Sequence, residues 1–518
     1  MADRAQPLGI GGIAGIGAAV LIPVLILSTT LAILWVAEPG QGLSPADWAA
    51  VRFTLWQALL SAVISVALAV PLARALARQR FRGRGVLVTL LGAPFLLPVI
   101  VAIFGLLAVF GRGGLVNAVL PVLGLPEVSI FGLHGVVLAH VFFNLPLATR
   151  LILQGWQEIP AERYRLAASL GMDAGAVNRH LEWPMLRQVV PGAALVIFVL
   201  CTTSFAVALT LGGGPRATTV ELAIYQALRF EFDLSRAAFL SLIQLAITVV
   251  LALVAYRFVR QPGFDAGLDR RVVRWDGRRA LLRLQDGVLI GMAVLFLLMP
   301  ILAVVLRGAS EVMALPSVVW ASALRSLCVA LASTLLVVVM GLSISLAVVR
   351  LGGWLETAGL LAVAASPLVM GTGLFVLIFP FMNPEVLALP VTVLVNAVVT
   401  LPFALRALVP ACRRIEADYG RLADSLGLAG WARMRLVVLP RLLRPLGFSA
   451  GLAAALSMGD LGVIALFADP EAATLPLQVY RLMGAYRMDE ASGAAVLLLA
   501  LSFALFWAFD RGARRADV

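Results

Sequence analysis

Few side chains in this sequence have the type and spacing that catalysis or metal binding requires. None of the three histidines stands in an HExxH pattern, and no two cysteines have the CxxC spacing of metal and redox sites. The cysteines are far apart along the chain, so they imply no disulfide framework. The sequence therefore predicts neither a metalloenzyme nor a metal site. The residues concerned are His134, His140, His180, Cys201, Cys328 and Cys412.

Nucleotide hydrolysis by the chain itself is excluded by its composition. A Walker A loop ends in GK[ST], where the lysine holds the nucleotide phosphates. All forty basic residues here are arginine, and the chain contains no lysine. We interpret the glycine run GGGP at 212–215 as the end of a hydrophobic segment rather than as a phosphate cradle. No cofactor is expected in this chain.

Polar groups inside apolar runs are the remaining chemical candidates. Asp460 is the one carboxylate that we place within such a run. An ionisable group is costly to bury in lipid, so it marks either a transport path or a hydrogen bond between helices. Both interpretations stay open. Four uncharged polar residues are further path candidates with the same alternative: His140, Asn144, Ser204 and Asn396.

The composition indicates a membrane protein with many spans. Hydrophobic residues make up 61% of the chain and charged residues 13%, far from the balance of a soluble domain. A helix needs about twenty apolar residues to cross the hydrocarbon core. The first such run lacks a convincing cleavage site, so we expect a retained span rather than a signal peptide. Twelve runs qualify, in two sets of six: 11–36, 51–73, 86–110, 133–153, 191–211 and 236–259, then 287–306, 323–349, 357–381, 387–409, 447–468 and 491–509.

The arginines are distributed unequally between the loops. With a cytoplasmic N-terminus, alternate loops place 31 Arg and 15 acidic residues inside, and 9 Arg and 12 acidic residues outside. This asymmetry follows the positive-inside rule and predicts that both termini are cytoplasmic. The basic runs 74–85 and 257–283 are then topology signals, and contact with membrane lipid is their lesser interpretation. Nucleic-acid binding is not expected despite the net charge of +12.

One polar phrase occurs twice, as RLAASLG at 165–171 and RLADSLG at 421–427. At a constant offset of 256, residues 145–186 and 401–442 share sixteen identities in forty-two positions without a gap. This agreement is beyond chance for matched compositions. The chain is therefore an internal duplication.

A weaker match extends the duplication toward the N-terminus. At an offset of 272, TLWQALLS (54–61) pairs with SLCVALAS (326–333). Six spans separate equivalent points, so the repeats are parallel rather than inverted. The predicted parts are a first half at 1–259, an Arg-rich cytoplasmic linker at 260–284 and a second half at 285–518.

The duplicated segments predict two similar loops, which we name the first repeated loop (about 156–190) and the second repeated loop (about 410–446). After Pro160 the sequence AERYRLAASLG can form about three helical turns. A glycine then fits the left-handed C-cap position, and a second short helix returns to the membrane at a proline. The second copy is expected to repeat each feature. The paired residues are Gly171 with Gly427 and Pro184 with Pro440.

The repeated loops resemble the cytoplasmic EAA loop of bacterial ABC-importer permeases, with its short helix, glycine and downstream proline. Two copies in one chain resemble the fused permeases of that group. A closer resemblance, to thiamine ABC-transporter permeases, covers nearly the whole chain. It rests on VRFTLWQALLSAVISVALAVPLARAL (51–76), LAHVFFNLPLATRL (138–151), LGGGPRATTVELAIYQAL (211–228) and SMGDLGVIALF (457–467).

This chain departs from the general EAA motif at two positions in each copy. Arg165 and Arg421 stand where the motif begins with Glu. Leu166 and Leu422 replace its first Ala. The arginines point to an acidic facing surface on the ATPase that the family uses.

With the twelve spans, the resemblance implies an all-α polytopic membrane protein built as two parallel six-helix permease repeats in the bacterial inner membrane. It implies a transport subunit that does no chemistry itself. Two copies of a separate cytoplasmic ATPase, which binds ATP and Mg, would each receive one repeated loop. The residues expected at these contacts are Arg165, Ala167, Ala168, Gly171 and Pro184 in the first loop, and Arg421, Ala423, Gly427 and Pro440 in the second. We expect the small alanines to let the partner approach closely.

The resemblance also implies a periplasmic substrate-binding protein, which would dock on the outside loops 212–235 and 469–490. Both loops carry mixed charge, which suits a transient wet interface and equally suits a soluble loop. The charged residues are Glu221, Glu231, Asp233, Asp469, Glu471, Arg216, Arg229, Arg481 and Arg487.

The substrate implied is thiamine or one of its phosphates, moved by alternating access. For the cationic thiazolium ring, Asp460 would supply the countercharge and Phe205 or Phe142 a π face. Three alternatives stay open: a ferric-iron permease of similar fused layout, a secondary transporter with twelve spans in parallel halves, and a structural or assembly membrane protein.

Overall fold

We describe the chain from a computed structural model, which covers residues 10–37, 43–91, 96–258, 280–356, 366–467 and 472–515, with 359, 361 and 362. Within these ranges the chain is helical and contains no strand. The all-α prediction is confirmed. Most of the predicted linker lies outside the described residues, so the boundary between the halves stays a prediction.

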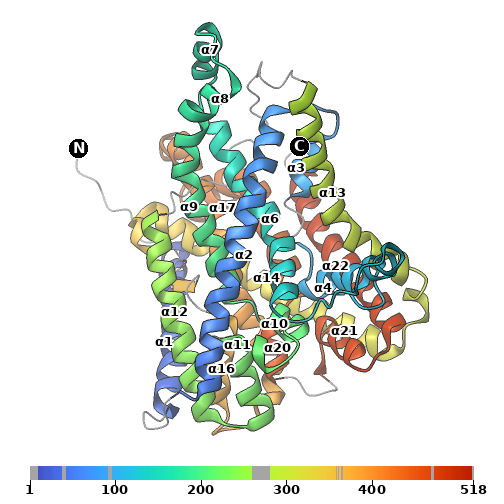
Figure 1. Cartoon of the computed structure of the whole chain (residues 1–518). Coiled ribbons are helices and arrows are strands. Elements are labelled where there is room, and N and C mark those ends of the chain that lie inside the picture. The colour runs from blue at the N-terminus through green and yellow to red at the C-terminus, as the bar shows by residue number, and fades with distance from the viewer. Residues whose placement is uncertain are drawn as a thin grey trace.

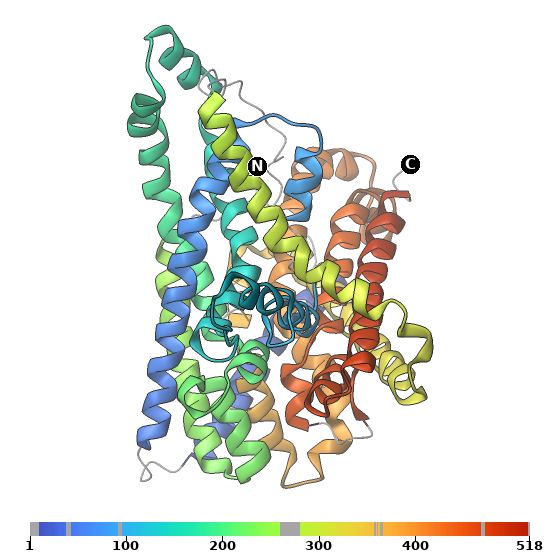
Figure 2. The same cartoon turned by 45° about the vertical axis from the view of Figure 1, so that its right-hand side comes forward.

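The helices form one elongated bundle, seen from two sides in Figures 1 and 2. The first half contains α1 (Ile10–Val36), α2 (Pro45–Arg78), α3 (Arg84–Leu90), α4 (Val99–Phe110), α5 (Leu115–Val119), α6 (Leu133–Glu158), α7 (Ala161–Ser169), α8 (Ala174–Val177), α9 (Trp183–Thr202), α10 (Phe205–Leu211), α11 (Val220–Gln226) and α12 (Leu234–Phe258). The second contains α13 (Ala280–Gly308), α14 (Ser317–Leu351), α16 (Pro367–Ile378), α17 (Ala388–Ser425), α18 (Gly430–Arg433), α19 (Leu439–Met458), α20 (Gly462–Phe467), α21 (Leu475–Gly484) and α22 (Met488–Arg515).

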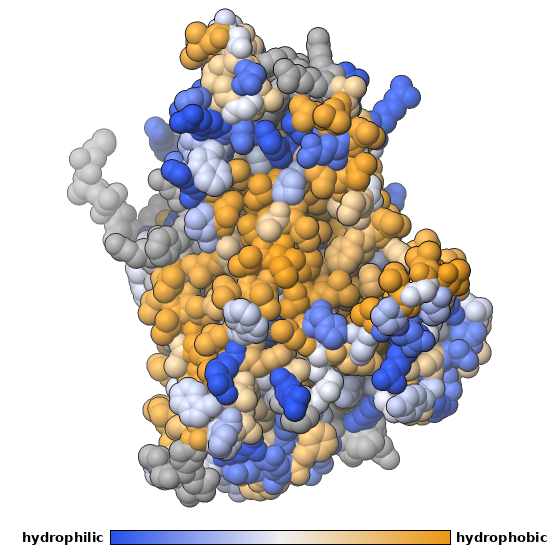
Figure 3. All heavy atoms as spheres, viewed as in Figure 1, coloured by the Kyte–Doolittle hydropathy of each residue, from blue (hydrophilic) through white to orange (hydrophobic). Residues whose placement is uncertain are grey.

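Eleven helices in the described part of the chain are long and apolar enough to cross a membrane. The remaining predicted span, 357–381, corresponds to the shorter apolar helix Pro367–Ile378. Figure 3 shows a broad apolar band around the middle of the bundle, with polar side chains gathered toward both ends. The chain is a multi-pass membrane protein.

Three predicted spans are interrupted, and one of them, 447–468, is broken between Met458 of α19 and Gly462 of α20. In the run 86–110, α3 ends at Leu90 and α4 begins after Pro98, because proline has no backbone N–H to donate and suits a helix start. In the run 191–211, α9 ends at Thr202, and Ser204 is extended before α10 begins. This second break lies near the centre of the bundle and returns below as part of the candidate path.

The first helix of each half packs against helices of the other half. In the first half α2, α6 and α9 pack together, as α14, α17 and α19 do in the second. Helix α1 lies against α14 and α16, whereas α13 lies against α2 and α4. Figure 2 shows α13 running diagonally across the bundle. The two halves are therefore interlocked.

Glycines allow the crossing helices to approach closely. A Cβ atom on Gly105 of α4 would lie 2.6 Å from the Pro300 carbonyl oxygen of α13. A Cβ atom on Gly373 of α16 would lie 2.5 Å from the Thr29 Cβ of α1. Glycine and other small residues commonly allow helix backbones to pack closely in lipid. Equivalent glycines thus serve the two reciprocal crossings.

The glycines of α1 provide a matched test of this crossing. Replacing Gly15 by alanine is expected to destabilise the protein by about 1–3 kcal/mol, because the new Cβ would lie 2.3 Å from the Ser343 carbonyl oxygen. The measurement is the melting temperature in detergent. Gly17→Ala on the same helix meets nothing within 4 Å and should leave the melting temperature unchanged. Equal shifts for both variants would contradict this packing.

The described ends of the chain lie at the same end of the bundle as the repeated loops. Gly15 near the start of α1 packs beside Ser343, close to the end of α14. A Cβ on Gly447, which follows the second repeated loop, would lie 2.2 Å from the Ala513 Cβ in α22. We name this the loop end and the opposite one the far end; Figure 1 shows α7, α8 and the C-terminus together at the loop end.

Candidate functional site

Both repeated loops end a helix with the same glycine cap. Gly171 and Gly427 have φ of +64° and +65°, the left-handed region that only glycine adopts cheaply. In the first loop Met172 N–H donates to the Ala167 carbonyl at 3.0 Å. In the second, Leu428 N–H donates to the Ala423 carbonyl at 2.9 Å. These are Schellman bonds, so the predicted C-caps are confirmed.

The return to the membrane is also alike in the two copies. After the short helices α8 and α18, a π-helical turn forms at Asn178–Glu182 (η3) and at Met434–Val438 (η10). Each turn precedes a proline, Pro184 or Pro440, in the first turn of the next long helix. A proline ring inside a regular helix clashes with the carbonyl four residues earlier, and a wider π turn removes that conflict.

The second loop does not repeat every feature of the first, contrary to the prediction. Ile159 is extended and Pro160 begins α7 as a separate helix, because a residue before proline avoids the helical region. Glu416 stands at the equivalent position of the second copy, and α17 continues without interruption to Ser425. In the first loop the short helix α7 is therefore separated from α6 by a break, whereas the second loop begins as a continuous extension of α17.

Ala167 and Ala423 are not on the surface of the repeated loops. Both side chains are buried within the chain, so they are not exposed for direct contact with a partner. The exposed surface of each short helix instead carries two leucines four residues apart, which lie on one helix face. Among these leucines and the predicted contact residues, the exposed ones are Arg165, Leu166, Ala168, Leu170 and Gly171 in the first loop, and Arg421, Leu422, Leu426 and Gly427 in the second, together with Pro184 and Pro440.

The first repeated loop is joined to the membrane helices by a buried carboxylate. Glu182 in η3 is fully buried and forms an ion pair of 2.9 Å with Arg74 of α2. Its other oxygen accepts a hydrogen bond from the Trp156 indole of α6 at 3.2 Å. Glu182 thus joins the first repeated loop to α2 and α6.

The second repeated loop is held by a different ion pair set. Arg433 of α18 contacts Glu416 and Asp424 of α17, each at 2.7 Å. Arg433 occupies the position of the buried Val177 in the first loop, and Val438 occupies that of Glu182. The two loops share a backbone shape but are stabilised by different side chains.

Asp460 lies at a break between helices that has a counterpart in the first half. It separates α19 from α20, just as Ser204 separates α9 from α10 at an offset of 256. The Asp460 Oδ1 accepts a hydrogen bond from Gly462 N–H at 3.2 Å, and its carboxyl group faces the Asn396 amide. The second oxygen, Oδ2, is buried without a hydrogen-bond partner in the described structure.

Phe205 is the aromatic candidate that the structure brings to this break. Its Cδ1 lies 3.8 Å from the position that a Cβ on Gly462 would occupy, and its ring contacts Tyr225 at a centroid distance of 5.2 Å. Phe142 instead packs edge-on against Phe143 and against Phe296 of α13. Of the two rings proposed beside Asp460, Phe205 is thus the one with supporting contacts.

The polar candidates of the first half form contacts between helices. Ser61 Oγ of α2 lies 3.3 Å from His140 Nδ1 of α6. Asn144 donates to the Cys201 sulfur of α9 at 3.3 Å. These contacts favour the interhelical hydrogen-bond interpretation for His140 and Asn144.

An equivalent cluster stands in the second half. Asn396 donates to Ser457 Oγ at 3.0 Å, and Ser457 donates to Ser333 Oγ at 3.1 Å. In this cluster Asn396 also faces the Asp460 carboxyl group, and it bonds Ser457, whereas His140 contacts Ser61. The correspondences, at offsets of 256 and 272, are Asn396 with His140, Ser457 with Cys201 and Ser333 with Ser61.

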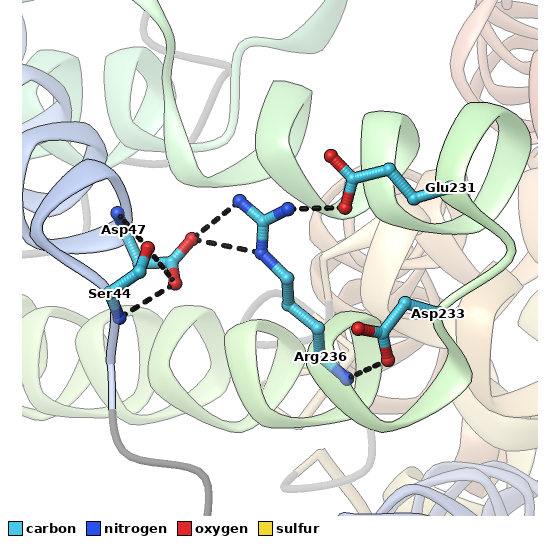
Figure 4. A network of polar contacts seen from close by, with 5 residues as sticks. All are labelled: Ser44, Asp47, Glu231, Asp233 and Arg236. Carbon is cyan, nitrogen blue, oxygen red and sulfur yellow. Dashed lines mark hydrogen bonds and ion pairs between the residues drawn. The ribbon is translucent and has the colours of Figure 1, made fainter.

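Part of the charge predicted to face a docking protein is engaged inside the chain (Figure 4). Arg236 of α12 donates to Asp47 Oδ1 of α2 at 2.8 Å and to the Glu231 carboxylate. Asp47 also accepts from Ser44 in the capping box that begins α2. Asp233 accepts from the Arg236 backbone N–H at 2.9 Å. Glu231 and Asp233 thus help to fix the far end of the bundle.

Glu221 is also not a surface residue. It is buried in α11 and accepts a hydrogen bond of 2.5 Å from Ser366 at the start of α16. Burial raises the pKa of Glu221 to about 7, although the Ser366 hydrogen bond opposes the rise. Hydropathy gave no signal for this contact between the halves. Asp469 and Glu471 lie outside the described residues.

Comparison with known proteins finds similar chains over nearly their full length. The thiamine transport system permease protein ThiP of Salmonella typhimurium is 42% identical over 532 residues, which cover 99% of this chain and 98% of that protein. ThiP of Brucella abortus (strain 2308) is 40% identical over 479 residues, with 90% and 88% covered. ThiP of Haemophilus influenzae is 34% identical over 483 residues, with 90% and 89% covered. No protein-family model matches the chain.

The matches extend across both halves and both repeated loops. The relatives are named as permease proteins of transport systems. Since identities of 34–42% cover most of each chain, this chain belongs to the family of thiamine transport system permeases, which are membrane transport subunits and not enzymes.

Proposed function

We propose that this chain is the membrane-spanning subunit of an ABC importer that moves thiamine or one of its phosphates from a periplasmic binding protein into the cytoplasm. The similarity to thiamine permeases supports the substrate. The observation that carries the proposal is the pair of equivalent loops at one end of the bundle, capped alike at Gly171 and Gly427. Two such loops suit a partner with twofold symmetry.

The partner on the loop end would be two copies of a cytoplasmic ATPase that binds ATP and Mg. The exposed leucine pairs offer apolar contact, while Arg165 and Arg421 favour an acidic surface around it. ATP-driven closure would draw the two loops together. Because Glu182 ties the first loop to α2 and α6, this movement would re-pack the membrane helices. The loop end, with both termini, would then face the cytoplasm.

The substrate path would pass between the halves at the paired helix breaks. Asp460 has a buried oxygen without a hydrogen-bond partner in the described structure, and the Phe205 ring lies beside the same turn. A carboxylate and an aromatic face are the groups that stabilise an organic cation. Ser204 would face the path at the equivalent point of the first half. The binding protein would dock at the far end.

Reconstitution tests the substrate directly. The permease, its ATPase and its binding protein are placed in proteoliposomes, and ATP hydrolysis is measured with each candidate solute. We expect thiamine or its phosphates to stimulate hydrolysis and to enter the vesicles. Stimulation by ferric ion but not by thiamine would reject the substrate. Thiamine uptake without the ATPase would indicate a secondary transporter and would reject the importer.

Asp460→Asn tests the countercharge in the same vesicles. We expect thiamine uptake to fall about tenfold or more, because a cation about 4 Å from a carboxylate gains on the order of 1–4 kcal/mol between watery and partly buried surroundings. Asparagine can still accept the Gly462 N–H bond and caps helices well, so the melting temperature should not change. Full thiamine uptake by this variant would show that the Asp460 charge is not needed in the substrate path.

A further inference from the structure

A cavity of about 390 Å³ opens at the far end between the two halves. Its walls come from η5 (Ala227–Glu231) of the first half and from α16, η9 (Pro384–Leu387) and α20 of the second. Its volume falls within the range of small-molecule sites. The lining residues that matter here are Arg229, Phe232, Phe375, Phe379, Glu385 and Leu466.

Aromatic rings form one side of this cavity. The Phe232 and Phe379 centroids are 5.5 Å apart, and Phe379 stacks on Phe375 at 6.0 Å. Phe232 has φ of +52°, a left-handed conformation that is unfavourable for a bulky side chain and that is retained where the surrounding structure requires it. This backbone holds the ring of the first half against the ring of the second. Ring faces of this kind attract organic cations.

A carboxylate lies at the edge of the same cavity. Glu385 Oε1 is 3.3 Å from Arg229 Nη1, in an ion pair that joins the two halves. Its other oxygen accepts a hydrogen bond from the Asn383 amide at 3.2 Å. Glu385 is therefore paired with a planar, delocalised cation at the mouth of an aromatic cavity. A ligand with the same chemistry can replace that cation if the arginine turns away.

We propose that this cavity is a receiving site for an aromatic organic cation, which binds against Phe232, Phe375 and Phe379 and displaces Arg229 from Glu385. The proposal rests on the proposed function, since thiamine carries an aromatic cation. It places a first binding step at the far end, before the substrate reaches the centre of the bundle.

Helix α20 connects this receiving site to Asp460. Leu466 near its end lines the cavity, and Phe467 packs on Phe375 at 5.5 Å. Asp460 lies two residues before its start at Gly462. Six helical residues span about 9 Å at 1.5 Å per residue. The cavity and the Asp460 break therefore lie at opposite ends of a single short helix.

Separate substitutions of Glu385 and Arg229 should change the affinity for thiamine in opposite directions. Radiolabelled thiamine is bound by equilibrium dialysis to the permease–ATPase complex in nanodiscs, without the binding protein. Glu385→Gln is expected to weaken binding about tenfold, because it removes the countercharge. Arg229→Gln is expected to strengthen binding severalfold, because it frees the carboxylate. If the ion pair only ties the halves together, both variants will shift binding in the same direction, and that result overturns the site.

The aromatic rings of the cavity are tested by substituting Phe379, with Tyr486 as the control. Phe379→Leu should weaken thiamine binding severalfold, while Phe379→Tyr should retain it, because it keeps the ring face. Tyr486, two residues beyond the end of α21, has the same left-handed conformation but is 86% exposed, so Tyr486→Leu should leave binding unchanged. Absence of any thiamine binding by the wild-type complex would also overturn the site. Thiamine-stimulated ATP hydrolysis after the binding protein is added to that complex would still support the proposed function, so the two can fail separately.

Discussion

Replacing Leu166 and Leu422 together by aspartate is expected to abolish ATP-driven uptake while the membrane bundle remains folded. These side chains are 61% and 55% exposed, so the free permease loses little packing. Burying a leucine against a partner gains about 1.5–3 kcal/mol, and a buried unpaired carboxylate adds a further cost. Loss of both contacts should weaken ATPase binding at least about a hundredfold. Co-purification with the ATPase and uptake into vesicles are the measurements.

A leucine outside the repeated loops provides the control for this pair. Leu123 is 67% exposed, and Leu123→Asp makes the same chemical change away from the repeated loops. We expect it to leave ATPase binding and uptake intact. Each single variant, Leu166→Asp or Leu422→Asp, should have an intermediate effect. Undiminished uptake by the double variant would show that the repeated loops do not transmit ATP-driven movement.

Asp286→Ala is expected to cost about 3–5 kcal/mol of stability. Arg78 of α2 donates to both carboxylate oxygens of Asp286 in α13, at 2.8 and 2.5 Å, and Gln79 adds a third bond at 2.6 Å. Both charged side chains are buried, so the alanine variant leaves an unpaired guanidinium inside the protein. The pair also fixes the crossing of α13 onto the first half. A large fall in melting temperature and in folded yield is the expected result.

Two further variants separate the ion pair from general packing. At an offset of 272, Arg350 of α14 is the counterpart of Arg78, but it is exposed. Arg350→Ala should therefore change stability by less than about 0.5 kcal/mol. Replacing the buried pair by Arg78→Met and Asp286→Leu together should restore stability to near the original value, because two apolar groups leave no buried charge. A double variant as unstable as Asp286→Ala would contradict the explanation.

The predictions that held depend on local chemistry. Gly171 and Gly427 could be assigned to left-handed caps because only glycine adopts that backbone at little cost. The apolar runs could be assigned to membrane helices because length and hydropathy suffice to define a span. The breaks inside the runs 86–110, 191–211 and 447–468 are not predicted, because hydropathy averages over a whole run and is insensitive to one proline or a few non-helical residues.

The errors at the repeated loops have a different origin. The duplicated sequence predicts two similar loops. A single difference, Pro160 against Glu416, separates α6 from α7 in the first copy but leaves α17 continuous in the second. The resemblance and the small size of Ala167 and Ala423 predict that they lie at the partner surface. Their side chains face inward, and small size does not indicate the direction in which a side chain points.

The sequence by itself determined the membrane class, the duplication, the glycine caps and the candidate carboxylate Asp460. Each of these follows from hydropathy, from identity at a fixed offset, or from the conformations that one residue type allows. Only the tertiary structure decided which groups are in contact. Helix α1 packs against the second half and α13 against the first. Phe205 rather than Phe142 lies beside the Asp460 break, and Arg229 pairs with Glu385. These contacts join residues far apart in the chain, and their geometry depends on how whole helices cross, which no local pattern in the sequence encodes.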